Sequence, residues 1–157
     1  MWGNVLFCVY CSQILQFSLI MLNLVGEYEI SVDAKGRFLL PATFRKQLPD
    51  GSGDRFIINR GFENCLTLYP IETWNKISAQ VDSLNDFNPK VREFKRLFRN
   101  GASFADVDSA GRILVPKMLL EHAHITKDMV FTAQGNEVEL WDKDTYYSYI
   151  DTNKDDF

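Results

Sequence analysis

Apolar and polar positions alternate in short runs along much of this chain, which is the pattern of half-buried β-strands. The runs "YEISV" (28–32) and "FLL" (38–40) flank the turn-forming residues "DAKGR". Pro41 follows them and suits the first turn of a short helix, "ATFRKQL". The longer run "FIINRGFENCLTLY" (56–69) then predicts a β-hairpin with a glycine near its bend.

The same order of elements returns later in the chain. The stretch "SVDAKGRFLLP" (31–41) reappears as "DVDSAGRILVP" (106–116), so that D-x-x-G-R-Φ-L-Φ-P, with Φ apolar, occurs twice. Pro116 again precedes a helix-like run, "KMLLEHA", and "MVFTAQGNEVELW" (129–141) predicts a second hairpin. A copy of about 45 residues buries too little apolar surface to stand alone, so the two copies are expected to share one core.

Between the copies the apolar period lengthens to that of a helix. An apolar stripe is followed by the helix-breaking "DFNP" (86–89); the stripe consists of Ile71, Trp74, Ile77, Val81 and Leu84. The next segment, "KVREFKRLFRN", predicts a second amphipathic helix. Its polar side carries a single acid, Glu93, among the cations Lys90, Arg92, Lys95, Arg96 and Arg99. This basic face is either a solvated surface or an accessory contact to DNA or to another subunit.

These patterns divide the chain into four segments besides its N-terminus. They are a first repeat (25–71), a helical insert (72–99), a second repeat (100–143) and a short acidic tail (151–157). The tail, "DTNKDDF", is expected to be frayed, as chain ends without apolar anchors usually are.

Residues 1–20 stand outside this division. No charged side chain occurs before Glu27, and the apolar run is long enough to span a bilayer. A secretory signal would need a positive n-region and a small-residue cleavage site, and both are missing. Because Met21 immediately precedes the first repeat, we interpret residues 1–20 as upstream sequence included through a mistaken start. A genuine membrane anchor is the alternative.

The composition excludes some classes of protein but does not identify the function. With 46% apolar and 24% charged residues, the chain is typical of a globular protein. Its net charge of −4 does not indicate a nucleic-acid binder, so any DNA contact must come from a local basic patch. Three cysteines argue against a disulfide scaffold and fit a reducing compartment.

Candidate catalytic and metal-binding residues are few. Cys8 and Cys11 form a C-x-x-C pair with no second pair to complete a zinc site, and Cys65 is expected to be a small core residue. The two histidines, His122 and His124, have no cysteine or carboxylate spaced to complete a metal set. No glycine-rich phosphate loop occurs. We therefore predict no catalytic residue, no metal and no cofactor.

The two D-x-x-G-R copies, with "NPKVREFKRLFRN" between them and "GNEVELWD" near the end, resemble the MraZ family of bacterial transcriptional regulators. The resemblance covers about residues 21–150. It implies two SpoVT/AbrB-type units in a mainly β fold with short helices (α+β), a pseudo-symmetric swapped-hairpin AbrB-like β-barrel plus the helical insert. It further implies a ring-shaped homo-oligomer in the cytoplasm, on the nucleoid.

The resemblance also implies the partner, which is double-stranded DNA with direct repeats upstream of the division and cell-wall gene cluster. No small-molecule substrate, cofactor or membrane is expected. The alternative is a protein-interaction or antitoxin-type module that has the same barrel and no operator of its own.

The first hairpin turn is the predicted DNA reader, because the major groove admits a two-stranded β-ribbon. Arg37 offers a planar fork that can pair with O6 and N7 of guanine, whereas Lys35 is better suited to phosphate. Arg45 and Lys46 on the following helix are predicted to add backbone contacts. The carboxylate of Asp33 would be repelled by phosphate, so we expect it to orient Arg37 and close the turn.

The glycines and the second turn complete the predicted site. Gly36 and Gly111 tolerate positive φ, and Asp33 and Asp108 can hydrogen-bond the turn backbone. Arg112 is a further candidate for DNA contact, although a structural ion pair with Asp108 is the stronger interpretation there. The second turn has Ser109-Ala110 in place of Ala34-Lys35, so the first turn is expected to be the main reader.

Overall fold

The computed structural model describes residues 22–50 and 53–156. The N-terminal segment 1–20, with Cys8 and Cys11, lies outside the described residues. Among the residues that are described, no helix has the length and apolar character needed to cross a bilayer.

Both repeats contain the predicted elements in the predicted order. The first comprises β1 (Glu27–Ser31), β2 (Arg37–Leu39), α2 (Ala42–Arg45), β3 (Arg55–Arg60) and β4 (Leu66–Pro70). The second comprises β5 (Ser103–Asp106), β6 (Arg112–Leu114), α5 (Lys117–His122), β7 (Asp128–Ala133) and β8 (Val138–Asp142). The prediction of strand, turn, strand, short helix and hairpin is therefore confirmed in each copy.

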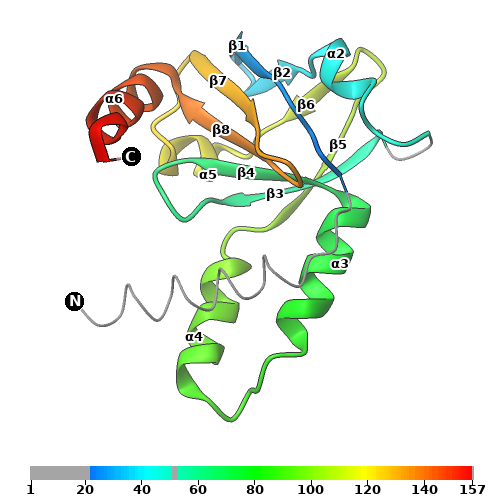
Figure 1. Cartoon of the computed structure of the whole chain (residues 1–157). Coiled ribbons are helices and arrows are strands. Elements are labelled where there is room, and N and C mark those ends of the chain that lie inside the picture. The colour runs from blue at the N-terminus through cyan, green and yellow to red at the C-terminus, as the bar shows by residue number, and fades with distance from the viewer. Residues whose placement is uncertain (1–21, 51–52, 157) are drawn as a thin grey trace.

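The two repeats exchange their first strands. The strands form a six-stranded antiparallel sheet of order β1-β7-β8-β4-β3-β5 and a two-stranded ribbon, β2-β6 (Figure 1). Thus β1 joins the hairpin of the second repeat and β5 joins that of the first, while β2 pairs with β6. Neither repeat could complete its sheet alone, which is the physical reason that two copies are needed.

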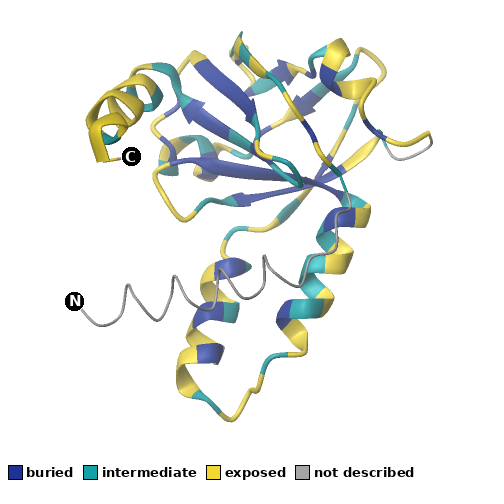
Figure 2. Cartoon of the chain, in the orientation of Figure 1, coloured by how far each residue is buried: buried dark blue, intermediate teal, exposed yellow. Residues whose placement is uncertain are grey.

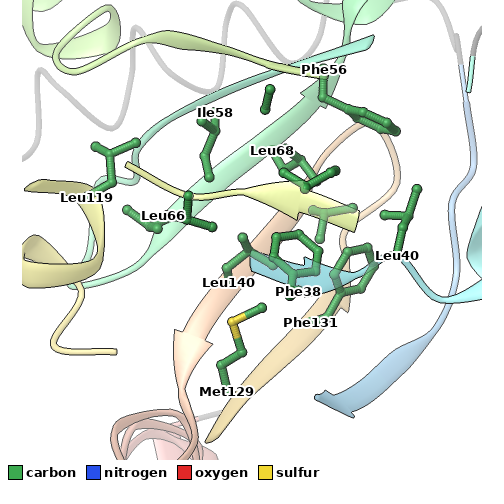
Figure 3. Close-up of a cluster of buried hydrophobic side chains, with 14 of the residues drawn as sticks. Phe38, Leu40, Phe56, Ile58, Leu66, Leu68, Leu119, Met129, Phe131 and Leu140 are labelled. Carbon is green, nitrogen blue, oxygen red and sulfur yellow. The ribbon is translucent and has the colours of Figure 1, made fainter. Parts of the chain in front are cut away.

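The fold class of mostly antiparallel sheet with short helices is confirmed. A closed barrel is not shown, because β1 and β5 are the two edges of the six-stranded sheet and no described residues pair them. The ribbon instead packs across the sheet and closes the core from one side (Figure 3).

The core lies between the ribbon and the sheet and takes side chains from both repeats (Figures 2 and 3). Phe131 of β7 is 0% exposed and forms edge contacts with Phe44, Tyr28 and Phe38 at centroid distances of 4.9, 5.9 and 6.2 Å. Phe131 belongs to the second repeat and its three aromatic neighbours to the first. The two repeats therefore form one hydrophobic core, as their small size requires.

The insert forms an antiparallel helical arm that projects from the sheet (Figure 1). It consists of α3 (Ile71–Asp82) and α4 (Pro89–Phe98), so both predicted helices are confirmed. The side chain of Asn88 accepts a hydrogen bond from the backbone N–H of Lys90, which caps α4 at its N-terminus. The two helices meet through a separate cluster in which Trp74 stacks on Phe98 at 5.1 Å.

The C-terminal residues differ from the frayed tail that we expected. Helix α6 (Lys143–Asn153) and a 3-10 turn, η1 (Lys154–Asp156), continue through this segment. The side chain of Asp142 caps α6 by accepting from the backbone N–H of Thr145. Tyr146 and Tyr147 donate hydrogen bonds to Glu27 and Glu29 of β1, and these contacts hold the helix to the sheet.

Glu63 of the β3–β4 turn, Glu137 just before β8 and Glu139 of β8 lie close together. Burial, with the nearby carboxylates of Glu139 and Glu63, raises the pKa of Glu137 to about 6, while a hydrogen bond from Tyr69 acts in the opposite direction. None of the ion pairs among the described residues includes Glu137 or Glu139. The ionised form of Glu137 is therefore less favourable in the folded chain than in the unfolded chain.

Replacing Glu137 with glutamine is expected to stabilise the protein in a pH-dependent way. The folded pKa of about 6 exceeds the ordinary value of 4.5, so ionised Glu137 lowers stability above pH 6 and has no effect well below pH 4.5. Urea unfolding at pH 8 should show a gain of about 1–2 kcal/mol, and this gain should vanish on acidification through that window. The exposed Glu121→Gln is the matched control; a gain for Glu137→Gln that is equal at both ends of the range would contradict the assignment.

Candidate nucleic-acid interface

The β2–β6 ribbon places the two D-x-x-G-R turns at opposite ends of one short ladder. Its cross-strand pairs are Arg37 with Leu114, Phe38 with Ile113, and Leu39 with Arg112. Successive side chains of a strand point to opposite faces. Phe38 and Ile113 enter the core, so both arginines and both leucines share the outer face.

The first turn is closed by Asp33. Its Oδ1 accepts hydrogen bonds from the backbone N–H groups of Lys35 and Arg37, both at 2.9 Å. Its Oδ2 accepts from Nε of Arg37 at 2.8 Å. These contacts, the backbone N–H of Arg37 first among them, hold the pKa of Asp33 below its usual value. Gly36 adopts a φ of 82°, a backbone conformation that is unfavourable for residues with a side chain.

The second turn repeats this geometry. Oδ1 of Asp108 accepts from the backbone N–H groups of Ala110 and Arg112 at 2.9 Å, and Oδ2 accepts from Nε of Arg112 at 3.0 Å. Gly111 has a φ of 80°, and the backbone hydrogen bond from Arg112 lowers the pKa of Asp108. Each turn thus has the same aspartate, glycine and arginine in the same arrangement.

Each turn also accepts a backbone hydrogen bond from the other repeat. The backbone N–H of Val115 donates to the carbonyl of Gly36 at 2.9 Å, and that of Leu40 donates to the carbonyl of Gly111 at 3.0 Å. These reciprocal bonds hold the ribbon in one register. Each arginine binds its aspartate through Nε, and no hydrogen bond from its two Nη groups occurs within the described residues. Both guanidinium forks are therefore oriented and still able to donate.

The other predicted DNA-binding cations, Lys35, Arg45 and Lys46, lie in the first turn and on helix α2. Lys35 is exposed in the first turn. Arg45 donates through Nη2 to Asp54 at 2.7 Å, and its Nη1 lies 3.7 Å from the position that a side chain on Gly111 would occupy. Helix α2 therefore brings Arg45 beside the second turn. Lys46 follows at the C-terminal cap of α2 and is exposed.

The ribbon has one feature that sequence reasoning missed. Leu39 and Leu114 are 62% and 55% exposed beside the two arginines. The signal was present in the repeated R-Φ-L, because a period of two places the leucine on the arginine's face. The structure places Phe38 and Ile113 in the core and leaves the two leucines on the outer face.

The basic face of α4 is largely engaged within the helical arm. Nζ of Lys95 donates to Asp86 at 2.5 Å and to the carbonyls of Asp82 and Leu84, and its side chain is only 13% exposed. Arg99 binds Asp82 at 2.7 Å. Arg92 donates to the carbonyl of Asp86. These contacts favour a structural role, in which the cations join α4 to α3 and the intervening loop.

The residues considered for catalysis or metal binding lie elsewhere. Burial lowers the pKa of His122, and Cys65 is buried with a raised thiol pKa. Donor atoms of Glu63, Cys65 and Glu139 lie within 4.8 Å of one another, the one such group among the described residues. Cys65 and Glu139 directly precede Leu66 and Leu140, whose side chains face the core. Successive side chains of a strand point to opposite faces, so Cys65 and Glu139 lie on the face of the sheet opposite the ribbon.

Comparison with known proteins gives consistent similarities over nearly the whole described chain. The family described as "MraZ protein, putative antitoxin-like" matches residues 24–97 and 98–157. A protein of Christiangramia forsetii named Transcriptional regulator MraZ is 44% identical over 138 residues, which cover 87% of this chain and 89% of that protein. Proteins of the same name from Cytophaga hutchinsonii and Thermoanaerobacter pseudethanolicus are 41% and 42% identical. They cover 84% and 80% of this chain and 87% and 85% of their own lengths.

Proposed function

The chain belongs to the MraZ family, and on that premise we propose that it is a transcriptional regulator that binds double-stranded DNA through the β2–β6 ribbon. Relatives that match most of their own length are named for transcriptional regulation, which is a non-enzymatic role. No cofactor and no small-molecule substrate enter this function.

The observation that carries the proposal is the pair of pre-oriented guanidinium forks on a two-stranded ribbon. The major groove admits such a ribbon, and an arginine fork can pair with O6 and N7 of guanine. Asp33 and Asp108 bind the Nε atoms and leave the Nη groups of Arg37 and Arg112 free to donate. Because the forks are already positioned, less side-chain entropy is lost when DNA binds.

Although the chain has a net charge of −4, cations near the ribbon would give it a local positive surface for DNA. Lys35, Arg45 and Lys46 would meet phosphates beside the forks, whereas Asp33, Gly36, Asp108 and Gly111 shape the turns. A subunit that neutralises two to four phosphates gives a salt slope of only about −2 to −4 and binds weakly. A ring of subunits on repeated sites raises the apparent affinity by about 10²–10⁴-fold through effective concentration.

We accordingly propose that the protein acts as a ring-shaped homo-oligomer on direct repeats upstream of the division and cell-wall gene cluster, in the cytoplasm and on the nucleoid. The first repeat (25–71) and the second (100–143) would together supply each ribbon. The insert (72–99) would form the arm, and residues 151–157 would end the chain.

Footprinting on DNA upstream of the protein's own gene, across a salt series, tests this function. We expect short protected sites at a regular spacing, with protection that is lost steeply as salt rises because many phosphates are contacted at once. Uniform, sequence-independent protection, or none, would favour the alternative of a protein-interaction or antitoxin-type module with no operator of its own.

A further inference from the structure

We propose that Leu39 and Leu114 read thymine methyl groups in the major groove, so that the ribbon specifies thymine as well as guanine. The inference rests on the proposed DNA-binding function and goes beyond it by assigning two apolar residues to base recognition.

Nothing among residues 22–50 and 53–156 covers these leucines. Their strand neighbours Phe38 and Ile113 are at most 1% exposed, and the core is complete without them. A single exposed leucine is ordinary in a folded protein. Here the two leucines occupy equivalent positions of the two repeats, on the face that carries the arginines. Together they form an exposed apolar surface of the kind that marks a binding site.

The spacing of the four outer side chains matches that of base edges. Arg37 lies directly across from Leu114, and Leu39 lies across from Arg112. Cross-strand neighbours have Cβ atoms about 4.5–5.5 Å apart, and neighbours on one strand face are about 6.6 Å apart. Bases of one strand rise by about 3.4 Å, so each leucine reaches an edge about one to two base pairs from that read by an arginine.

DNA suits this surface better than a second protein copy does. Thymine is the base that presents a methyl group in the major groove, and apolar side chains are its usual contacts there. A protein surface that covered the leucines would also have to remove water from two guanidinium groups, which is costly unless it supplied carboxylates of its own. DNA supplies guanine acceptors and thymine methyl groups side by side.

Replacing single thymines by deoxyuridine tests the assignment, because the two bases differ only in the methyl group. Duplexes that the full-length chain selects from a random library are the probes, and binding is measured by titration. At a thymine about one or two base pairs from an essential guanine, deoxyuridine should weaken binding by about 3–10-fold, the effect of burying one or two apolar carbons. Leu39→Ala should weaken binding to the unmodified duplex similarly and remove the sensitivity at that position; Leu114→Ala should do so at a different position.

The possible outcomes distinguish failure of this inference from failure of the proposed DNA-binding function. If the chain selects no sequence, the proposed function itself fails. If it selects DNA whose binding depends on Arg37, but no position responds to deoxyuridine or Leu39→Ala keeps the response, the inference alone is wrong. Phe87→Ala, at a residue 93% exposed in the loop between α3 and α4, is the matched control and should keep every response. A Leu39→Ala protein with a changed sedimentation mass would assign the leucine to a subunit contact and overturn the proposal.

Discussion

Replacing Arg37 with alanine is expected to weaken operator binding by at least about 10²-fold. One bidentate arginine–guanine pair contributes about 1–3 kcal/mol of discrimination, and the proposed ring, by engaging two or more repeats, would lose that contribution at each of them. The turn itself should survive, because Asp33 also accepts from two backbone N–H groups that the substitution leaves in place. Gel-shift titration of DNA from upstream of the gene, at fixed salt, measures the change.

Two further variants show whether charge or geometry accounts for this effect. Arg37→Lys keeps the charge and loses the planar fork, so it should bind almost as weakly as the alanine variant and lose its preference for guanine. Lys154→Ala removes a cation from η1, which is paired with Asp151, and should bind as the unchanged protein does. Wild-type affinity in Arg37→Ala would show that the ribbon does not read the operator.

Replacing Phe131 with alanine is expected to lower the free energy of unfolding by about 3–5 kcal/mol, the range for a large aromatic residue removed from a packed core. The ring is fully buried and contacts aromatic residues of the other repeat, so the cavity would open where the two halves meet. That loss is a large share of the stability of a small domain. Equilibrium denaturation followed by circular dichroism provides the measurement.

The manner of unfolding is as informative as its free energy. Because β1 and β5 are exchanged, both repeats should unfold in one transition in the variant as in the unchanged protein. Phe87→Ala removes the same side chain from an exposed site and should change stability by less than about 0.5 kcal/mol. Separate transitions for the two repeats would contradict the shared core.

Much of the fold could be predicted because its signals are local. The period-two runs and the glycine turns gave the strands, and the longer period with "DFNP" gave the arm. The helix that runs into the acidic tail was not predicted, since α6 is held to β1 by Tyr146 and Tyr147 through contacts to residues distant in sequence. The cations of α4 could be placed on one face, but their partners in α3 and its loop became visible only with the helices packed.

The candidate site divides in the same way. Asp33, Gly36 and Arg37 lie within five residues, so their spacing alone predicts a closed turn that carries a guanidinium. That Arg112 stands across the ladder from Leu39, and that both leucines remain exposed, depends on pairing between strands far apart in the chain.

The sequence by itself determined that this protein is a duplicated β unit with an arginine turn in each copy, because strand period, turn chemistry and helix breakers act over a few residues. Only the tertiary structure decided that the copies exchange strands and that their turns join in one two-sided ribbon. Such pairing is selected by burial of a common core, and that free energy exists only when segments from both halves of the chain are in contact.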